Sequence, residues 1–203
     1  MPLGSWAIRG FRHSDANRLT EINPTFVSPT VLRVHKTGQG LEVGWRLEEV
    51  VLAEPYDKGA AYDFTPEDVA EIAARARRPD CLVLVAEAWG RLVGLLDLEI
   101  TRWNNTGFLW NLRVDVAHRG RGLGRALFER GVAWARDRNL RSIVVETQTN
   151  NVPACRFYRR LGCRLVGIRE EYYTNRDLET GEVALFWAYT LSDTAPDAFG
   201  APV

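Results

Sequence analysis

The sequence is poor in lysine and cysteine, and it has no excess charge of either sign. Its 26 basic residues balance 26 acidic ones, so no overall charge draws the chain to nucleic acid or a membrane surface. Lys36 and Lys58 are the only lysines, so most positive charge is arginine, whose fork suits phosphates and carboxylates. The three cysteines form no CxxC pair, which argues against a disulfide framework and a zinc ribbon.

Long apolar runs are also missing. None approaches the roughly 18 residues that span a bilayer, and the start, MPLGSWAIRGF, lacks the basic-then-apolar order of a signal peptide. His13, His35 and His118 do not have the spacing of metal ligands. We therefore expect a cytoplasmic protein with no metal, no membrane contact and no nucleic-acid partner.

The length of 203 residues suits one domain with a short extension. We expect a single domain over residues 1–192, with a divergent N-terminal part, 1–80, and a core, 81–192. The polar, proline-containing end, 193–203, is expected to be a flexible tail.

Two local signals in the first half are specific. In TPEDVAEIAARARRPD, Thr65 can cap a helix, Pro66 suits its first position and Asp68 completes a capping box. Farther on, Trp89-Gly90-Arg91 separates two β-rich runs and predicts a hairpin. In the second run, Asp97 and Glu99 alternate with apolar residues, so both carboxylates should share one face.

The second half alternates strands and helices. FLWNLRVDV, RSIVVETQT and EVALFWAYTL read as strands, and VPACRFYRRLG reads as a short helix closed by Gly162. With the hairpin before them, these elements predict an α/β (α+β) fold with a mixed sheet.

The stretch RVDVAHRGRGLGRALF carries glycine at 120, 122 and 124 directly before an amphipathic helix. Such a helix start offers unpaired amides to a phosphate, and glycine allows close approach. A Walker loop is excluded because its lysine is absent. A dinucleotide fingerprint is weakened, since Arg125 replaces the third glycine, although Glu146 lies at a plausible distance. The alternative to a phosphate-binding loop is a solvated Arg/Gly-rich turn with no ligand.

Two motifs in the right order resemble the GNAT superfamily of N-acyltransferases. Residues Arg119 to Gly124 fit its acetyl-CoA loop pattern, [RQ]-x-x-G-x-[GA]. A downstream motif, N-x-x-A-x-x-[FL]-Y-x-x-x-G-F, is matched at Asn151, Ala154, Phe157, Tyr158 and Gly162, with Cys163 in place of its final phenylalanine.

The C-terminal half also resembles streptothricin acetyltransferases. The similarity lies in VVETQTNNVPACRFYRRLGCRLVGIREEYYTN and EVALFWAYTL, and a weaker similarity lies in VVLAEPYDK. Those enzymes usually carry an acidic pair on the strand before the coenzyme loop, where this chain has Trp110 and Asn111. A cationic antibiotic would lose two carboxylates at that point.

The resemblance implies the GNAT (acyl-CoA N-acyltransferase) fold, with a mostly antiparallel central sheet splayed in the middle and helices on both faces. It also implies acetyl-CoA as cofactor. The residues expected to bind it are Leu112, Arg113, Val114, Arg119, Gly120, Arg121, Gly122, Leu123, Gly124, Arg125, Asn151, Ala154, Phe157 and Tyr158.

The same resemblance suggests catalytic roles. Tyr158 is the candidate general acid for the departing thiolate, since phenol and thiol pKa values of about 10 and 8.5 are comparable. Glu146, or a chain of waters, would take a proton from the acceptor amine. The acceptor is expected to meet Asp97, Glu99, Trp110, Asn111 and Tyr173. The alternatives without a catalytic role are that Tyr158 is a core residue and that the carboxylates form surface ion pairs.

The expected function is acetyl-CoA-dependent N-acetylation of a primary amine on a small molecule, such as an aminoglycoside- or streptothricin-type antibiotic. Two alternatives stay open: a protein lysine or N-terminal amine as acceptor, and a non-catalytic sensor of acyl-CoA. Edge strands often pair between subunits in this fold, so a homodimer is one candidate assembly.

Overall fold

The computed structural model describes residues 6–191, and the expected tail, 193–203, lies outside them. The described chain divides into two compact units. The first unit contains residues 6–25, 59–145 and 189–191. The second contains Phe26–Lys58 and Glu146–Ala188, so the division falls within one strand, after Val145.

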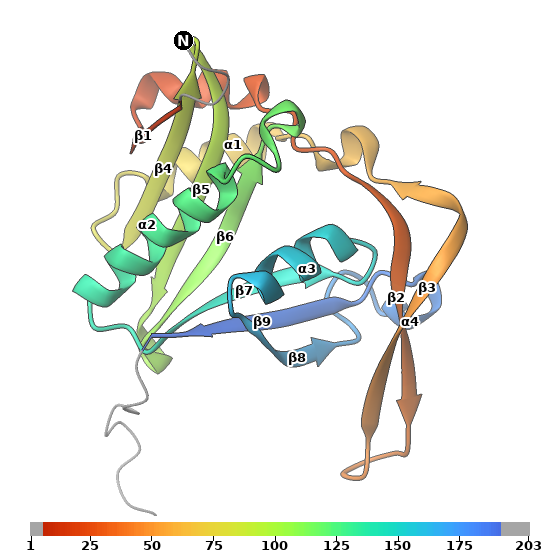
Figure 1. Cartoon of the computed structure of the whole chain (residues 1–203). Coiled ribbons are helices and arrows are strands. Elements are labelled where there is room, and N and C mark those ends of the chain that lie inside the picture. The colour runs from red at the N-terminus through yellow and green to blue at the C-terminus, as the bar shows by residue number, and fades with distance from the viewer. Residues whose placement is uncertain (1–5, 192–203) are drawn as a thin grey trace, which may run out of the picture. The chain divides into compact units, whose positions relative to one another are not determined.

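The first unit is built on a sheet in the order β1-β4-β5-β6-β7 (Figure 1). Its strands are β1 (Ala7–Gly10), β4 (Cys81–Ala88), β5 (Arg91–Thr101), β6 (Thr106–Val114) and the first part of β7 (Ser142–Gln148). Neighbours are antiparallel except β6 and β7, which run parallel. The expected mostly antiparallel mixed sheet is therefore confirmed.

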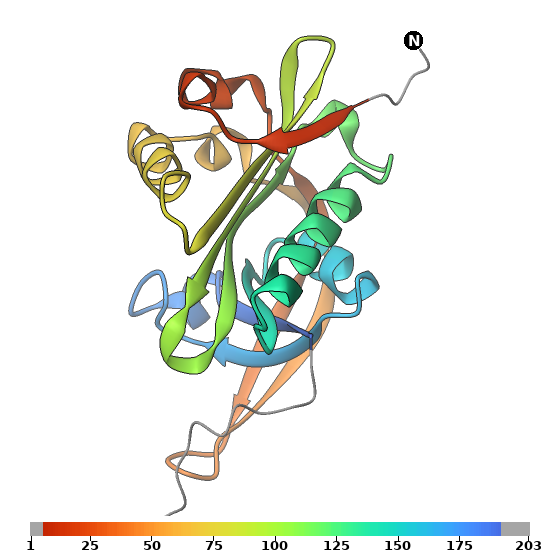
Figure 2. The ribbon, with the colours of Figure 1, turned by 90° about the vertical axis from the view of Figure 1, so that its left-hand side faces the viewer.

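Helices cover both faces of this sheet, as expected (Figure 2). Helix α1 (Pro66–Arg75) lies on one face and α2 (Leu123–Asp137) on the other. Short 3₁₀ turns complete the unit: η1 (His13–Glu21), η2 (Gly59–Tyr62), η3 (Arg102–Asn104) and η4 (Val116–His118). No helix within residues 6–191 is both long and apolar enough to span a membrane.

Local signals in the sequence explain several of these elements. Thr65 caps α1 and accepts from the Asp68 amide, while the Asp68 side chain accepts in return from the Thr65 amide. Trp89 and Gly90 both have positive φ, +48° and +76°, which is the type I′ geometry that favours a hairpin. The expected cap and hairpin are confirmed.

Apolar packing joins α1 to the sheet. A cluster of buried side chains on this side comprises Leu19, Ile22, Phe64, Ile72, Val83, Val85, Leu92 and Leu95. On the other side, the absence of a side chain at Gly131 lets α2 approach β5 closely, since an added Cβ would lie 3.2 Å from Leu96 Cδ1. The backbone of α2, and with it the loop that precedes it, is thereby fixed against the sheet.

Two irregularities mark β6. The register with β5 pairs Asp97 with Asn111 but Leu98 with Leu109, so Trp110 is the extra residue of a β-bulge. The parallel ladder with β7 runs from Thr106–Ser142 to Leu109–Val145, and β6 continues for five residues after its last pair.

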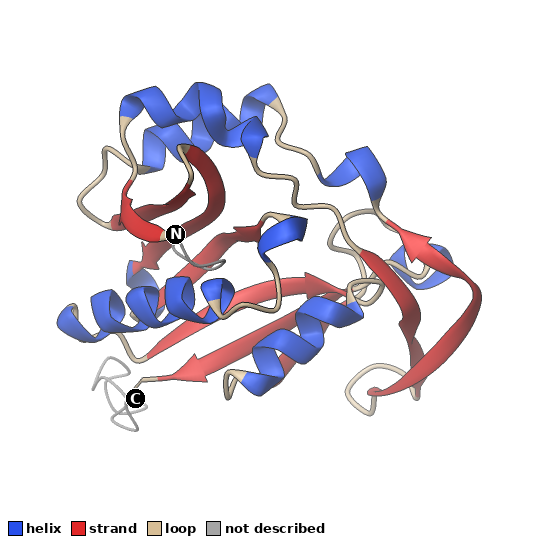
Figure 3. Cartoon of the chain, turned by 45° about the horizontal axis from the view of Figure 1, so that its top comes forward, coloured by secondary structure: helices blue, strands red, loops and turns tan. Residues whose placement is uncertain are grey.

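The second unit has two pairs of antiparallel strands. Strands β2 (Val27–Thr37) and β3 (Gly44–Asp57) form a long hairpin, and β8 (Arg164–Arg169) pairs with β9 (Ala184–Thr190) in the order β7-β9-β8. Helices α3 (Val152–Arg160) and α4 (Asp177–Thr180) complete it (Figure 3). Residues 54–57 belong to β3, and β8 was not anticipated from the sequence.

Buried Thr149 ties the second unit together. Its backbone carbonyl accepts from the Leu32 amide of β2 at 2.9 Å, and its amide donates to the Val183 carbonyl at 3.0 Å. Its hydroxyl donates to the Gly181 carbonyl and accepts from the Val183 amide. One threonine therefore links the hairpin to the segment before β9.

Candidate active site

In the first unit, a loop joins β6 to α2 and is held firmly at its start. One oxygen of Asp115 accepts from the Ala117 amide at 3.0 Å, and the other accepts from the Asn23 amide at 3.0 Å. The Val116 amide donates to the Asn23 carbonyl at 2.9 Å. Residues distant in the sequence therefore fix the chain just before the glycines.

Arg119 continues this anchoring. Its guanidinium donates to the Val114 carbonyl at 3.0 Å and to the Pro24 carbonyl at 2.6 Å. The side chain expected to contact a phosphate is thus engaged with protein carbonyls. Arg121 and Arg125 are exposed, and the nearest carboxylate to Arg125 is Glu129 at 3.9 Å. These two arginines have the freedom that an incoming anion needs.

The glycines adopt backbone conformations that other residues rarely take. Gly120 has φ of +72° and Gly122, the N-cap of α2, has φ of +84°. A Cβ built on either would meet no atom within 4 Å, so the space above both is open. The positive φ values favour glycine at both positions, and their role in holding a coenzyme stays a prediction.

Helix α2 begins with unpaired amides. Its first hydrogen bond runs from the Ala126 amide to the Gly122 carbonyl at 2.9 Å. Within residues 6–191, the amides of Leu123, Gly124 and Arg125 have no recorded acceptor. These amides lie at the positive end of the helix dipole, so they are groups that could hold an anion. Leu123 is buried, so only its amide can serve there.

The end of β6 was expected to supply backbone groups to the pantetheine arm of a coenzyme. Leu112 pairs with Leu96 and Val114 with Gly94 on β5. The Val114 carbonyl accepts from Arg119, so that carbonyl is occupied. The Arg113 guanidinium lies 4.2 Å from the Phe64 ring centre and donates to the Tyr62 carbonyl at 3.1 Å. The Arg113 side chain therefore packs against residues in and just after η2.

Asp97, expected near the acceptor, is completely buried. Its carboxylate pairs with Arg75 of α1 at 2.8 Å and accepts from the Asn111 amide group at 3.2 Å. Burial opposes the positive charge of Arg75, yet the hydrogen bonds that Arg75 donates to Asp97 and Glu71 raise its pKa. Asp97 and Arg75 therefore form a buried ion pair to which Asn111 donates a hydrogen bond, and no part of Asp97 is exposed to an acceptor.

This buried pair predicts a large effect on stability. Arg75→Ala is expected to lower the free energy of unfolding by about 3 kcal/mol, because it leaves the Asp97 carboxylate buried without its cation. Urea unfolding followed by circular dichroism measures the change. Arg77→Ala, an exposed arginine beyond the same helix, is the control and should change stability by less than about 0.5 kcal/mol. Equal effects of the two substitutions would show that the pair does not stabilise the fold.

Glu99 and Trp110 form a more accessible group on the same strands. The Trp110 indole nitrogen donates to Glu99 at 2.8 Å, and Arg78 pairs with the other oxygen of Glu99 at 2.6 Å. Trp110 is 48% exposed, and the bulge turns it out of the ladder. Of the acceptor residues predicted in this unit, only Asp97 is buried, while Glu99, Trp110 and Asn111 keep some exposed surface.

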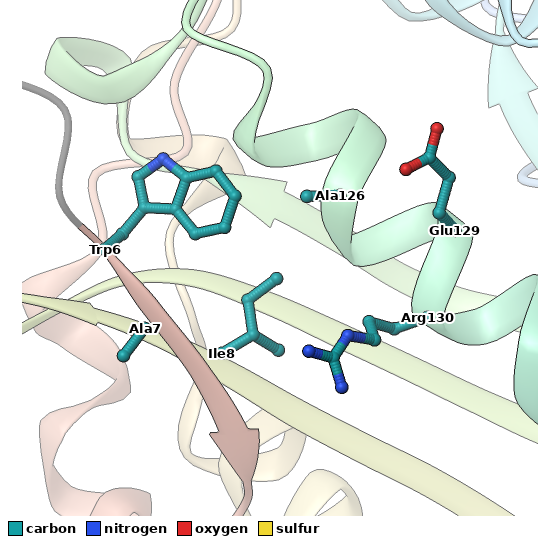
Figure 4. Close-up of a pocket in the computed structure, with 6 residues that line it drawn as sticks. All are labelled: Trp6, Ala7, Ile8, Ala126, Glu129 and Arg130. Carbon is teal, nitrogen blue, oxygen red and sulfur yellow. The ribbon is translucent and has the colours of Figure 1, made fainter.

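A separate cavity of about 550 Å³ lies between β1 and α2 (Figure 4). Trp6 and Ile8 point toward the helix, where Glu129 and Arg130 border the space. No sequence motif pointed to it. It is lined from the middle of α2, whereas the unpaired amides lie in the first turn of that helix.

In the second unit, the downstream motif spans all of α3, from its N-cap Asn151 to Gly162 beyond its last turn. The Asn151 side-chain oxygen accepts from the Ala154 amide at 3.1 Å, so Asn151 caps the helix. Tyr158 is buried, and its ring centre lies 5.2 Å from that of Phe157. Asn151 thus has a capping role, and a coenzyme contact by this residue stays a prediction.

Glu146 lies in the same unit and contacts one predicted partner directly. The Tyr173 hydroxyl donates a hydrogen bond to Oε1 of Glu146. Burial raises the pKa of Glu146, and the hydrogen bond from Tyr173 partly offsets that rise. Burial beside Glu146 also raises the pKa of Tyr173. A carboxyl with a raised pKa is a better proton acceptor than an ordinary one.

Two further charges influence Glu146. Lys58 pairs with Glu182 at 2.7 Å, and both affect the pKa of Glu146 electrostatically. Lys58 and Glu182 are 124 positions apart, so no sequence pattern could have joined them. Within residues 6–191, no group of three or more His, Cys, Asp or Glu side chains is arranged to hold a metal ion.

Comparisons with known proteins agree with the sequence motifs. A protein-family model described as "Acetyltransferase (GNAT) family" matches residues 44–163. The chain is 34% identical to a streptothricin acetyltransferase from Escherichia coli over 173 residues, which cover 85% of this chain and 89% of that protein.

Two solved structures resemble most of the chain. A nourseothricin acetyltransferase has a TM-score of 0.77 at 28% identity, covering 92% of this chain and 99% of that one. A protein from Bacillus anthracis str. Ames, solved in complex with acetyl coenzyme A, has a TM-score of 0.72 at 25% identity with the same coverage.

Proposed function

This chain belongs to the GNAT acetyltransferase family, and from that premise we propose that it transfers an acetyl group from acetyl-CoA to a primary amine of a small molecule. A streptothricin-type antibiotic is the acceptor that the comparisons favour, since relatives and structural neighbours covering most of the chain carry that activity in their names.

The observation that carries the proposal is the set of unpaired amides at the start of α2. A coenzyme A diphosphate needs several donors in one place and a backbone that it can approach. Residues 123–125 supply the amides, and Gly120 and Gly122 leave the space above them open. Arg121 and Arg125 are exposed and can add charge. The loop therefore fits the group that the family binds.

Bound acetyl-CoA would supply an activated acetyl thioester. The residues of the chain have three tasks: to hold it, to remove a proton from the acceptor ammonium, and to return a proton to the departing sulfur. We assign the first task to the α2 amides with Arg121 and Arg125. We assign the second to Glu146, whose pKa is raised by burial. We assign the third to the Tyr158 hydroxyl.

The acceptor is assigned to a cationic amine because carboxylates and aromatic rings occur at the predicted positions. In the first unit, Trp110 and Glu99 present an exposed ring beside a carboxylate. In the second, Glu146 lies beside Tyr173. Trp110 and Asn111 stand where streptothricin acetyltransferases usually carry two acidic residues. The affinity of this chain for strongly cationic antibiotics therefore has to be measured.

The direct test is thiol release from acetyl-CoA with a panel of amines. Streptothricin is expected to give turnover, and polyamines, an aminoglycoside and a peptide with a free N-terminus are the comparison acceptors. Equilibrium binding of acetyl-CoA is measured in parallel by calorimetry. Turnover with the peptide alone would move the acceptor to proteins. Tight binding without turnover on any amine would indicate a sensor, and absence of binding would refute the proposal.

A further inference from the structure

The turn that follows β8 is built to hold one side chain, Tyr173. The Asp177 carboxylate, which is almost completely buried, accepts from the amides of Tyr172 and Tyr173 at 2.8 and 2.9 Å. Its other oxygen accepts from the amide and the hydroxyl of Thr174, both at 2.7 Å. One carboxylate thus immobilises three consecutive residues.

The ring of Tyr173 is also fixed from its side. Tyr172 packs edge-on against Tyr173 with ring centres 5.1 Å apart, and Tyr172 packs in turn against Phe186 of β9 at 5.5 Å. The only recorded hydrogen bond of the Tyr173 hydroxyl within residues 6–191 goes to Glu146. A tyrosine held at both its backbone and its ring, with its hydroxyl on one carboxylate, is arranged to position that carboxylate.

The charged residues that act on Glu146 come from two other segments. Lys58 follows β3, and it pairs at 2.7 Å with Glu182, which precedes β9. Glu182 disfavours the ionised form of Glu146, whereas Lys58 favours it. Tyr172 and Cys155 also sense the charge of Glu146, and both remain neutral near pH 7 because burial raises their pKa values.

We infer that Tyr173 is the positioning residue of Glu146, and that it acts with the Lys58–Glu182 pair to keep this carboxylate ionised and oriented for the acceptor amine. The inference rests on the proposed function, in which Glu146 takes the proton. The hydroxyl of Tyr173 stabilises the ionised carboxylate by donating to it, and Lys58 stabilises it through space. Glu182 has the opposite effect, which its pairing with Lys58 limits.

Substituting each of the three residues should shift the pKa of Glu146 in a predicted direction, and a pH profile of kcat/KM measures that shift. Activity needs ionised Glu146, so the acidic limb of the profile lies at the pKa of this group. Tyr173→Phe removes a stabilising hydrogen bond, so the pKa of Glu146 rises and the limb moves to higher pH. Lys58→Met moves it in the same direction. Glu182→Gln removes a negative charge and moves it to lower pH.

On the acidic limb, Tyr173→Phe is expected to reduce kcat/KM by about 3-fold to 10-fold relative to the unmodified protein, with recovery on the plateau. Tyr172→Phe is the matched control, because its hydroxyl has no recorded hydrogen bond within residues 6–191, and the limb should stay in place. Titration of the acceptor amine is common to all variants and cancels in the ratios.

Two results would overturn the inference: profiles that superimpose, or a loss from Tyr173→Phe that is uniform across pH. A ¹³C NMR titration of the Glu146 side-chain carboxyl gives the same three signs without turnover. If no amine is acetylated, the proposed function fails while the titration still decides the role of Tyr173. If turnover is normal and the titration midpoints coincide, the inference fails alone.

Discussion

Gly122→Val is expected to abolish measurable binding of acetyl-CoA. Gly122 is the N-cap of α2 with φ of +84°, a conformation that valine takes only with strain. The added side chain would occupy the open space above the unpaired amides, where the diphosphate must come close. Losing two hydrogen bonds to a charged group at about 1.5–3 kcal/mol each weakens binding by roughly 100-fold or more. Isothermal titration calorimetry measures the loss.

The strain of a positive φ needs its own control. Gly90 lies in the hairpin of the same unit with φ of +76°, and a Cβ there would also meet no atom within 4 Å. Gly90→Val therefore imposes a similar backbone cost without touching the loop before α2. It should lower stability and leave the dissociation constant of acetyl-CoA within about 3-fold. Equal loss of binding in both variants would mean that general destabilisation, not blocked access, explains the effect at Gly122.

Local physical signals carried the prediction of this loop. Alternating glycines before an amphipathic stretch predict a helix start with free amides, and both backbone conformation and open space agree. The Thr65–Asp68 capping box and the Trp89–Gly90 turn were readable for the same reason. In each case the residues that determine the structure lie within a few positions of one another, so a short sequence window contains the whole cause.

Contacts between distant segments escaped prediction. Alternation correctly placed Asp97 and Glu99 on one face, but it could not show that Arg75 and Arg78 occupy both carboxylates. Likewise, nothing in the sequence near Arg119 indicates that its guanidinium binds the Pro24 carbonyl, 95 positions away. Charged side chains of this kind look like ligand-binding residues until the folded chain supplies their partners.

The second unit shows the same limit for secondary structure. The β2–β3 hairpin extends to Asp57, although its last residues include Glu54, Pro55 and Asp57, which local propensity assigns to a loop. Pairing across the hairpin brings Val27 opposite Asp57 and keeps the strand extended. Tertiary pairing overrides propensity here, and it also places Lys58 beside Glu182, next to the turn that holds Tyr173.

Tyr158→Phe is expected to reduce kcat by about 100-fold and to leave the affinity for acetyl-CoA within about 3-fold. The substitution removes only the hydroxyl, while the buried ring keeps its packing against Phe157. A proton donor acts as the bond to sulfur breaks, so its loss lowers kcat and kcat/KM together and spares binding. Steady-state kinetics with streptothricin, together with calorimetry of acetyl-CoA, separate the two quantities.

The chemistry of the leaving group makes this prediction sharper. If Tyr158 protonates the departing sulfur, an acetyl thioester with a more acidic thiol needs less help, so Tyr158→Phe should cost less with such a donor. Tyr189→Phe is the matched control and should keep kcat within about 2-fold, because Tyr189 lies in the first unit, where its ring packs edge-on against Phe128. A penalty for Tyr158→Phe that does not change with the acidity of the thiol would assign the tyrosine to packing, because a packing defect is indifferent to the pKa of the leaving group.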